Sequence, residues 1–113
     1  MGMPAIVVIT IVIDDYVLDV LMRDLVGHDH APSTFVVYLF LWRATAGTRP
    51  RSVRISHNGI ADETGLSKSA VQAALRRLNR RKLVRSERET PTSTPLHFVL
   101  KPWVMSRRRP AGR

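Results

Sequence analysis

The sequence predicts a mainly α fold with a small β-hairpin (α+β), and three features of the chain lead to that assignment. Residues 57–84 have the pattern of two short helices joined by a glycine turn, and residues 34–47 form a longer, strongly apolar helix. Two short strand-like segments, 83–89 and 96–101, follow the helices and are separated by a polar loop. A chain of 113 residues can bury one core of this kind, so we expect a single folded unit.

The N-terminal segment Ile6–Ile13 is almost wholly β-branched, which favours an extended strand over a helix. Because apolar and polar residues do not alternate along it, we expect the strand to be covered on both faces. Two parts could cover the strand: the rest of the domain, or a second copy of the chain.

A helical pattern begins at Asp14 and runs to about residue 26. Asp14 and Asp15 carry the negative charge that suits a helix N-terminus. Gly27 and the following residues HDHAP interrupt the pattern. The apolar stripe of this helix is expected to consist of Val17, Leu18, Leu21, Met22 and Leu25.

The apolar segment 34–47 is predicted to be the core helix. Ser33 stands where it would cap the helix N-terminus, and Gly47 stands where the helix would end. The segment 48–56 begins as a loop and becomes a short strand around Val53–Ile55. The residues expected in the core are Phe35, Val36, Leu39, Phe40 and Trp42. Aromatic residues at this helical spacing are more often core than the lining of a ligand pocket.

Residues 57–84 carry the most informative pattern. Ala61 is a small residue where two crossing helices approach closely, and Gly65 follows where the first helix must stop in a left-handed conformation. Leu66 packs the turn, and Ser67 caps the second helix. That helix has an apolar stripe of Val71, Leu75 and Leu78 and an opposite face of Lys68, Ser69, Gln72, Ala73, Arg76 and Arg80. This pattern is typical of a helix-turn-helix and indicates binding to duplex DNA; a purely structural helical hairpin is the alternative.

The charge distribution favours a nucleic-acid partner. Residues 1–42 hold one base and five acids, a net charge of −4, whereas residues 43–113 hold 17 bases and four acids, a net charge of +13. The basic part surrounds the helix-turn-helix, as expected of a protein that binds the phosphate backbone. A membrane-facing patch would need aromatic residues and leucines among the bases, which the polar face of the basic helix lacks. We therefore expect double-stranded DNA as the partner, and no membrane.

Two strands joined by a polar loop directly after the second helix predict a β-hairpin, or wing. The strands are LVRSERE (83–89) and LHFVLK (96–101), and the loop between them, TPTSTP, contains two prolines. The C-terminal residues 106–113 are basic and interrupted by proline, and we expect them to be disordered.

With these elements in order, the chain resembles the winged helix-turn-helix DNA-binding domains of bacterial transcriptional regulators and of plasmid and phage replication proteins. The matching residues are FVVYLFLWRATAG and RSVRISHNGIADETGLSKSAVQAALRRLNRRKLVRSE. The resemblance implies a winged helix-turn-helix domain over 33–105, with its recognition helix at about 67–81 and its wing at about 83–101. The N-terminal strand and helix, within residues 1–32, depart from a minimal winged helix and leave room for a dimerisation element.

The resemblance also implies roles for individual residues. The start of the recognition helix would lie in the major groove, where Gln pairs with adenine and Arg or Lys pairs with guanine. The expected base contacts are Lys68, Ser69, Gln72, Ala73 and Arg76. The expected phosphate contacts are Ser56, His57, Asn58, Ser67, Arg77, Arg80, Arg81, Lys82, Arg85 and Arg88. For any one of these side chains, a solvated position on the surface is the alternative.

No residue pattern indicates catalysis or a cofactor. The chain has no cysteine, no glycine-rich phosphate loop and no defensible Ser-His-Asp arrangement, so we expect no enzyme and no catalytic residue. His28 and His30 lack a further ligand nearby, which favours an exposed turn over a metal site. We expect no metal, no cofactor and no small-molecule ligand. The apolar run 5–13 is too short to span a bilayer and follows no basic segment, so the cytoplasm is the expected location.

Three functions fit these residues. The first is sequence-specific regulation of transcription, and the second is replication initiation or plasmid maintenance by a protein that binds an origin. The third is a winged-helix protein-interaction module, which the density of bases over 68–88 disfavours. The apolar N-terminal strand and helix predict a homodimer, because pairing with a second copy would cover them.

Overall fold

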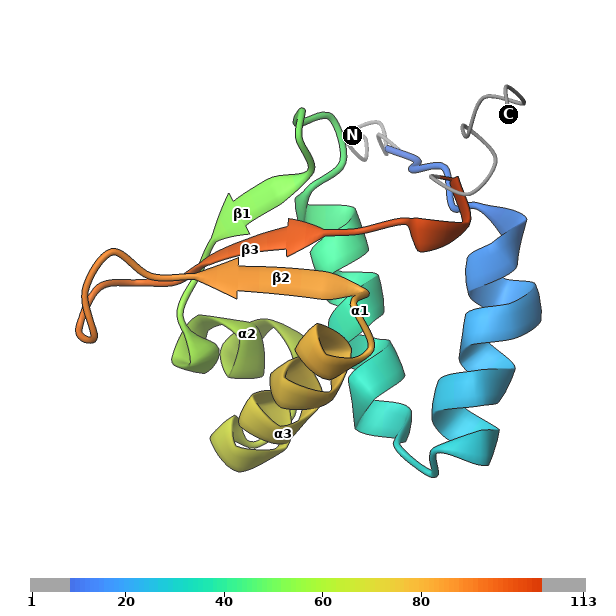
Figure 1. Ribbon diagram of the computed structural model, residues 1–113, viewed down its shortest axis with the longest axis horizontal. Coiled ribbons are helices and arrows are strands. Elements are labelled where there is room, and N and C mark those ends of the chain that lie inside the picture. Colours follow the sequence, from blue (N-terminus) through green and yellow to red (C-terminus); the bar gives the residue numbers. More distant parts are fainter. Residues whose placement is uncertain (1–8, 105–113) are drawn as a thin grey trace, which may run out of the picture.

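The chain folds into helices packed around a small antiparallel sheet (Figure 1), as seen in a computed structural model that describes residues 9–104. In chain order the elements are η1 (Val17–Leu21), η2 (Arg23–His28), α1 (Pro32–Ala44), β1 (Ser52–Arg54), α2 (His57–Thr64), α3 (Lys68–Arg80), β2 (Val84–Glu87) and β3 (Leu96–Val99). This is a winged helix-turn-helix fold, which confirms the mainly α fold class with a β-hairpin. Among residues 9–104, no helix has the length and apolar character needed to cross a membrane.

The sheet has the strand order β1-β3-β2, and both pairings are antiparallel. β2 and β3 form the predicted hairpin, in which Val84 pairs with Val99 and Glu87 with Leu96. The loop between these strands projects well beyond the sheet (Figure 1). β1 ends one residue earlier than predicted. The N–H of Ile55 still bonds in register to the carbonyl of Pro95 at 3.2 Å, but proline has no N–H with which to return the second bond of the pair.

α1 is the centre of the core, as the sequence predicts, but its buried face differs from the predicted one. Of the expected core residues, Phe35 and Trp42 are buried, whereas Val36 is 38% exposed. Leu39 and Phe40 are half-buried. The other buried apolar residues of α1 are Val37, Tyr38 and Leu41. The segment is apolar on all sides, so its pattern contains no polar stripe that would mark the solvent face.

The start of α1 also differs from the prediction. Ala31 is the N-cap, the helix begins at Pro32, and no side chain caps it, so Ser33 lies inside the first turn. Proline suits this position because it has no N–H to satisfy and its fixed φ matches the helix. The helix ends at Ala44, and Gly47 turns the chain with a positive φ of 89°.

The predicted N-terminal strand is absent from the described residues 9–13, which have no regular secondary structure and pair with no strand. Ile11 and Ile13 pack against the core, whereas the side chains of Ile9 and Val12 are exposed. The segment is held by a side chain, since the indole Nε1 of Trp42 donates to the carbonyl of Val12 over 2.8 Å. The other part of the prediction, residues 6–8, lies outside the described residues, as does the expected disorder of 106–113.

The N-terminal helix is present over residues 15–28, and most of it has π-type hydrogen bonding. The Asp29 N–H, for example, bonds to the Asp24 carbonyl five residues earlier, at 2.8 Å. Three of the five predicted stripe residues, Val17, Leu21 and Leu25, are buried in the core. Leu18 and Met22 are exposed, because the wide turn places residues four apart on one face and turns this second row away from α1.

Candidate nucleic-acid interface

The turn between α2 and α3 has the geometry that the sequence predicts. Ser56 caps α2 by accepting from the Gly59 N–H at 3.0 Å, and Ser67 caps α3 by accepting from the Ala70 N–H at 3.1 Å. Between the helices Gly65 has a left-handed φ of 82°. These three features fix the direction in which α3 leaves α2.

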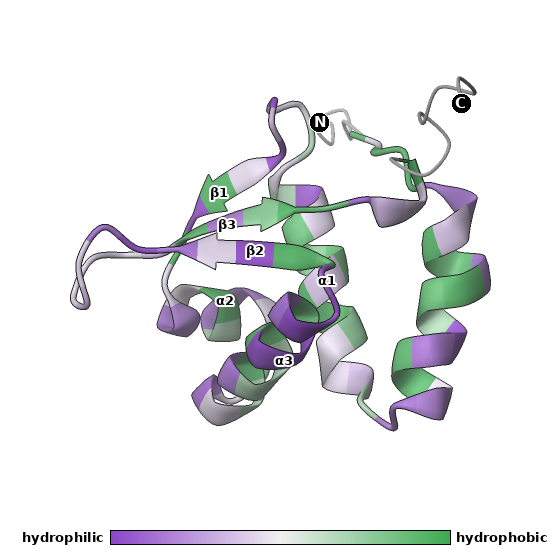
Figure 2. Ribbon diagram, in the orientation of Figure 1, coloured by the Kyte–Doolittle hydropathy of each residue, from purple (hydrophilic) through white to green (hydrophobic). Residues whose placement is uncertain are grey.

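α3 divides into a buried and an exposed face. Val71, Leu75 and Leu78 are buried, as predicted, and Ala74 is buried with them. The face opposite is hydrophilic (Figure 2). Of the predicted base-contact and neighbouring residues, the exposed ones are Lys68, Ser69, Ala73, Arg76 and Arg80. Gln72 is half-buried, because it lies at the edge of this face next to α2.

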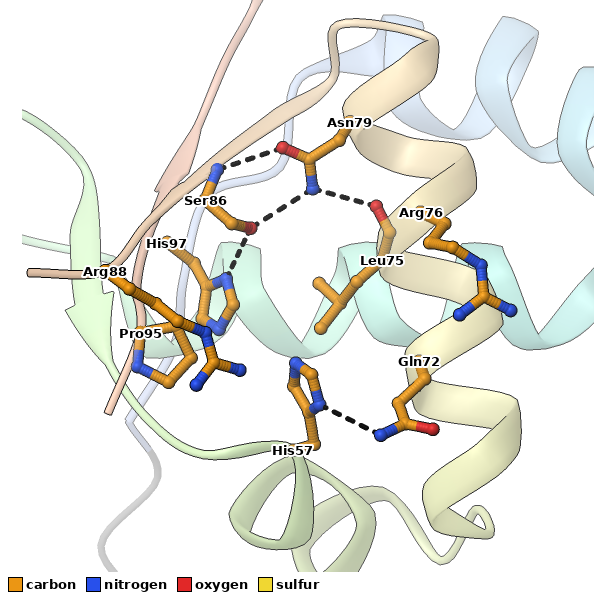
Figure 3. Close-up of a pocket in the computed structure, with 9 residues that line it drawn as sticks. All are labelled: His57, Gln72, Leu75, Arg76, Asn79, Ser86, Arg88, Pro95 and His97. Carbon is orange, nitrogen blue, oxygen red and sulfur yellow. Dashed lines mark hydrogen bonds between the residues drawn. The ribbon is translucent and has the colours of Figure 1, made fainter. Parts of the chain in front are cut away.

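Gln72 and His57 are brought together although they are 15 positions apart. The amide Nε2 of Gln72 lies 3.4 Å from Nδ1 of His57, which is in the first turn of α2. Figure 3 shows the amide nitrogen directed at the imidazole and the amide oxygen directed away from it. Burial, followed by the positive charges of Arg88 and Lys68, lowers the pKa of His57, so its neutral form is favoured.

A partly buried chain of hydrogen bonds connects α3 to the wing (Figure 3). Asn79 Nδ2 donates to Ser86 Oγ at 3.1 Å, and Ser86 Oγ lies 2.7 Å from Nδ1 of His97. On its other side, Nε2 of His97 lies 3.1 Å from the carbonyl of Ile55. A carbonyl only accepts, so Nε2 carries the proton, Nδ1 accepts, and Ser86 donates to it. The donor and the acceptor of each of these hydrogen bonds are therefore assigned, and His97 is neutral.

These residues were not among the predicted site residues. Burial is the largest cause of the lowered pKa of His97, which is about 4, and the side chain is fully buried. A signal was present in the hairpin: Ser86 pairs with His97 in the register, and both lie on the face that carries Val84 and Val99. A polar pair on the buried face of a hairpin is expected to be hydrogen-bonded.

The wing loop, residues 88–95, is braced by its own polar groups. The guanidinium of Arg88 donates to the carbonyls of Pro91 and Ser93, at 3.3 and 3.0 Å. Arg54 on β1 donates to the carbonyl of Thr94 at 3.0 Å. Arg88 in the loop and Arg54 beside it are therefore both held by hydrogen bonds to the loop backbone.

A groove of about 630 Å³ runs between α3, the start of α2 and the wing (Figure 3). It is lined by His57, Gln72, Leu75, Arg76, Asn79, Ser86, Arg88, Pro95 and His97. A smaller hollow of about 180 Å³ adjoins it and includes Ser56, Asn58 and Lys68. Seven of the predicted contact residues thus surround two adjoining hollows: Ser56, His57, Asn58, Lys68, Gln72, Arg76 and Arg88.

Two predicted phosphate contacts are engaged within the protein. The guanidinium of Arg81 bonds to Asp29 at 2.6 Å and to Asp24 at 3.3 Å, so it points to the N-terminal helix. Arg85 pairs with Glu87 at 2.8 Å and lies over the ring of Phe98, 4.1 Å from its centroid. Neither side chain faces the groove.

Most of the other basic side chains of the predicted interface are not paired with an acid of the described part of the chain. Among residues 9–104, the described ion pairs of arginine and lysine involve Arg81, Arg85 and Lys101 alone. The remaining basic side chains of the predicted interface form no ion pair within that part of the chain: Lys68, Arg76, Arg77, Arg80, Lys82 and Arg88. Their charge is therefore available to an external anion.

The His28-Asp29-His30 segment contains one short contact, 3.3 Å between Nδ1 of His28 and Oδ1 of Asp29. Within residues 9–104, no three His, Asp or Glu side chains gather in a way that could hold a metal ion. Asp29 is instead used by Arg81.

No protein-family model matches this chain, and no curated protein matches it. Among solved structures, the chain is similar to the crystal structure of the AntR antimony-specific transcriptional repressor. The sequence identity is 20%, the match covers 78% of this chain and 68% of that chain, and the TM-score is 0.49.

Proposed function

We propose that this protein binds duplex DNA in a sequence-dependent manner and acts as a small transcriptional regulator. α3 enters the major groove, and the wing follows the adjacent backbone. The observation that carries this proposal is the exposed face of α3, where uncompensated cations stand beside hydrogen-bonding side chains and next to an arginine-braced wing.

Base reading is assigned to the exposed face at the start of α3. The residues assigned to this face are Lys68, Ser69, Gln72, Ala73 and Arg76. The four polar side chains can match the donors and acceptors of base edges, and the methyl group of Ala73 can touch a thymine methyl. Backbone contact is assigned to two groups. The first, near the caps, is Ser56, His57, Asn58 and Ser67; the second, basic group is Arg77, Arg80, Lys82 and Arg88. Arg81 is left out because two aspartates already neutralise it, and Arg85 contributes only through long-range charge.

The protein is further proposed to act as a homodimer joined through its N-terminal helix, with no catalytic step. The exposed row Leu18, Met22 and Val26 lines a shallow hollow of about 590 Å³ together with Asp19, Arg23 and Gly27. Asp19 and Arg23 bring opposite charges to this row, so a second copy running antiparallel would place acid against base. Two recognition helices related by a two-fold axis would then read a roughly palindromic site.

DNA binding is tested by a salt titration with duplex oligonucleotides of random sequence, followed by selection of preferred sites from the same pool. A phosphate-binding protein loses affinity steeply as the salt concentration rises. Gln72→Ala and Arg76→Ala are expected to weaken the selected site by about 1–3 kcal/mol and to relax the preference at defined base positions.

Arg80→Ala and Lys82→Ala are the matched controls, because these side chains lie at the end of α3 or just after it, are exposed, and are assigned to phosphates. They should weaken all sequences alike and flatten the salt dependence. If the two classes of variant behave identically, the division between base reading and backbone contact is wrong. If affinity does not depend on salt, DNA is not the partner, and a protein-interaction module becomes the better explanation.

A further inference from the structure

His57 lies outside α3 yet contacts Gln72, a polar side chain at the edge of the exposed face of α3. It belongs to the first turn of α2, capped by Ser56, so its backbone is fixed by a different helix from that of Gln72. The contact of 3.4 Å between His57 Nδ1 and Gln72 Nε2 joins the two helices at the floor of the groove. A glutamine side chain has several rotatable bonds, and a partner on a second helix restricts them.

The chemistry of the two groups fixes which atom of Gln72 remains free. An amide Nε2 only donates, so Nδ1 of the imidazole must accept and Nε2 of His57 must carry the proton. The amide nitrogen has two N–H bonds. When the one opposite to the oxygen is used by His57, the other N–H and Oε1 remain together as one free edge. Figure 3 shows Oε1 turned away from His57, as this arrangement requires.

A free edge with one donor and one acceptor is complementary to adenine in the major groove, where N7 accepts and N6 donates. We propose that His57 is a positioning residue that holds the Gln72 amide in the orientation that reads adenine. This inference rests on the proposed DNA binding and adds to it the identity of one base and the residue that selects it. Which base α3 recognises then depends partly on a residue of α2.

The charges around His57 support this role. Lys68 and Arg76 approach it from α3, Arg88 from the wing and the neutral His97 from β3, and the hollows next to it contain these same side chains. This surrounding lowers the pKa of His57 below its ordinary value, mainly through burial. The accepting form of Nδ1 is thereby maintained near neutral pH. A protonated His57 would donate from Nδ1, oblige the amide to turn its oxygen inward, and destroy the adenine-reading edge.

The test is site selection from a random duplex pool with the wild-type protein, His57→Ala and His57→Asn, at about pH 8 and about pH 5. Asparagine places an amide oxygen near the position of Nδ1 and does not titrate in this range. We expect the wild type to select adenine at one position at the higher pH and to select it less strongly at the lower pH, because the protonated form of His57 gains population as the pH falls. His57→Ala should lack the preference at both pH values, whereas His57→Asn should keep it at both.

The variants separate this inference from the proposed function. If the wild type binds DNA but His57→Ala keeps the adenine preference, His57 does not position Gln72, and the DNA-binding proposal stands. If His57→Asn loses the preference at the lower pH as the wild type does, the pH effect comes from another group, and the inference fails. If no variant or wild type binds DNA, the proposed function itself fails.

Discussion

Gly65 is the residue whose conformation the helix-turn-helix most depends on. Its φ of +82° lies in the left-handed region, and its N–H bonds to the Ala61 carbonyl at 2.9 Å, which closes the end of α2. A Cβ added at this position would meet no atom within 4 Å. Any substitution is therefore opposed by backbone strain and not by a steric clash with neighbours.

Replacing Gly65 by valine should lower the free energy of unfolding by about 1–2 kcal/mol, because a β-branched residue is disfavoured at positive φ. Gly65→Asn is the matched control, since asparagine tolerates this conformation and should cost clearly less. Thermal unfolding monitored by circular dichroism measures both. Equal midpoints for the wild type and Gly65→Val would mean that the turn adopts another conformation.

At the level of the elements, the wing is attached to α3 by the polar chain from Asn79 to His97 as well as by apolar packing. The side-chain amide of Asn79 makes three hydrogen bonds. Its Nδ2 donates to the Leu75 carbonyl and to Ser86 Oγ, and its Oδ1 accepts from the Ser86 N–H. Such a chain specifies one orientation of the hairpin against the helix, because each buried donor needs its acceptor in place. The wing is thereby aligned with the face of α3 that is proposed to read DNA.

The buried His97 should make stability depend on pH. Its pKa falls from 6.5 in the unfolded chain to about 4 in the fold, so the unfolded state binds more protons between these values. The stabilisation is fully present above pH 6.5 and is lost progressively as the pH falls through about 4. The midpoint of thermal unfolding should therefore drop across this window.

His97→Gln provides the control for that measurement. Its amide nitrogen can still donate to the Ile55 carbonyl, but it does not titrate, so this variant should be less stable at neutral pH and show a smaller loss on acidification. The lowered pKa of His57 contributes in the same direction in both proteins and cancels in the comparison. Parallel pH profiles for the two proteins would show that His97 is not the titrating group.

At the scale of the whole molecule, the two ends differ in net charge and in the apolar side chains that they expose. The N-terminal helix lies at the opposite end from the wing (Figure 1), and it belongs to the acidic part of the chain. Leu18, Met22 and Val26 are 47%, 43% and 38% exposed there. A second copy bound at this end would leave both basic faces open to DNA, which is the arrangement that the proposed regulator needs.

Met22→Lys should weaken the proposed dimer by at least about tenfold, because an unpaired ammonium group would be buried at its centre. Val36→Lys is the matched control, since Val36 is an apolar residue of similar exposure on α1 that does not line the hollow. Sedimentation equilibrium at micromolar concentrations distinguishes the two. A wild-type protein that sediments as a monomer under these conditions would rule out the dimer.

Much of the fold was predictable because local chemistry decides it. Serine caps at Ser56 and Ser67 and a left-handed glycine at Gly65 act within one helical turn, so the sequence alone determined where α2 begins and ends and where α3 begins. The strong contrast between the apolar and the polar face of α3 likewise allowed its buried residues to be predicted. By the same reasoning, the uniformly apolar segments at 6–13 and in α1 had no contrast between polar and apolar faces. The predicted strand was wrong over the described residues 9–13, and the predicted buried face of α1 was wrong at Val36.

The tertiary structure alone decided which polar groups meet. His57 with Gln72, Arg81 with Asp24 and Asp29, and His97 with Ile55 join residues 15 to 57 positions apart. A sequence pattern shows that a side chain is polar and on which face of its own element it lies. Its partner depends on how separate elements pack, because a hydrogen bond or an ion pair requires distances that only the assembled core fixes.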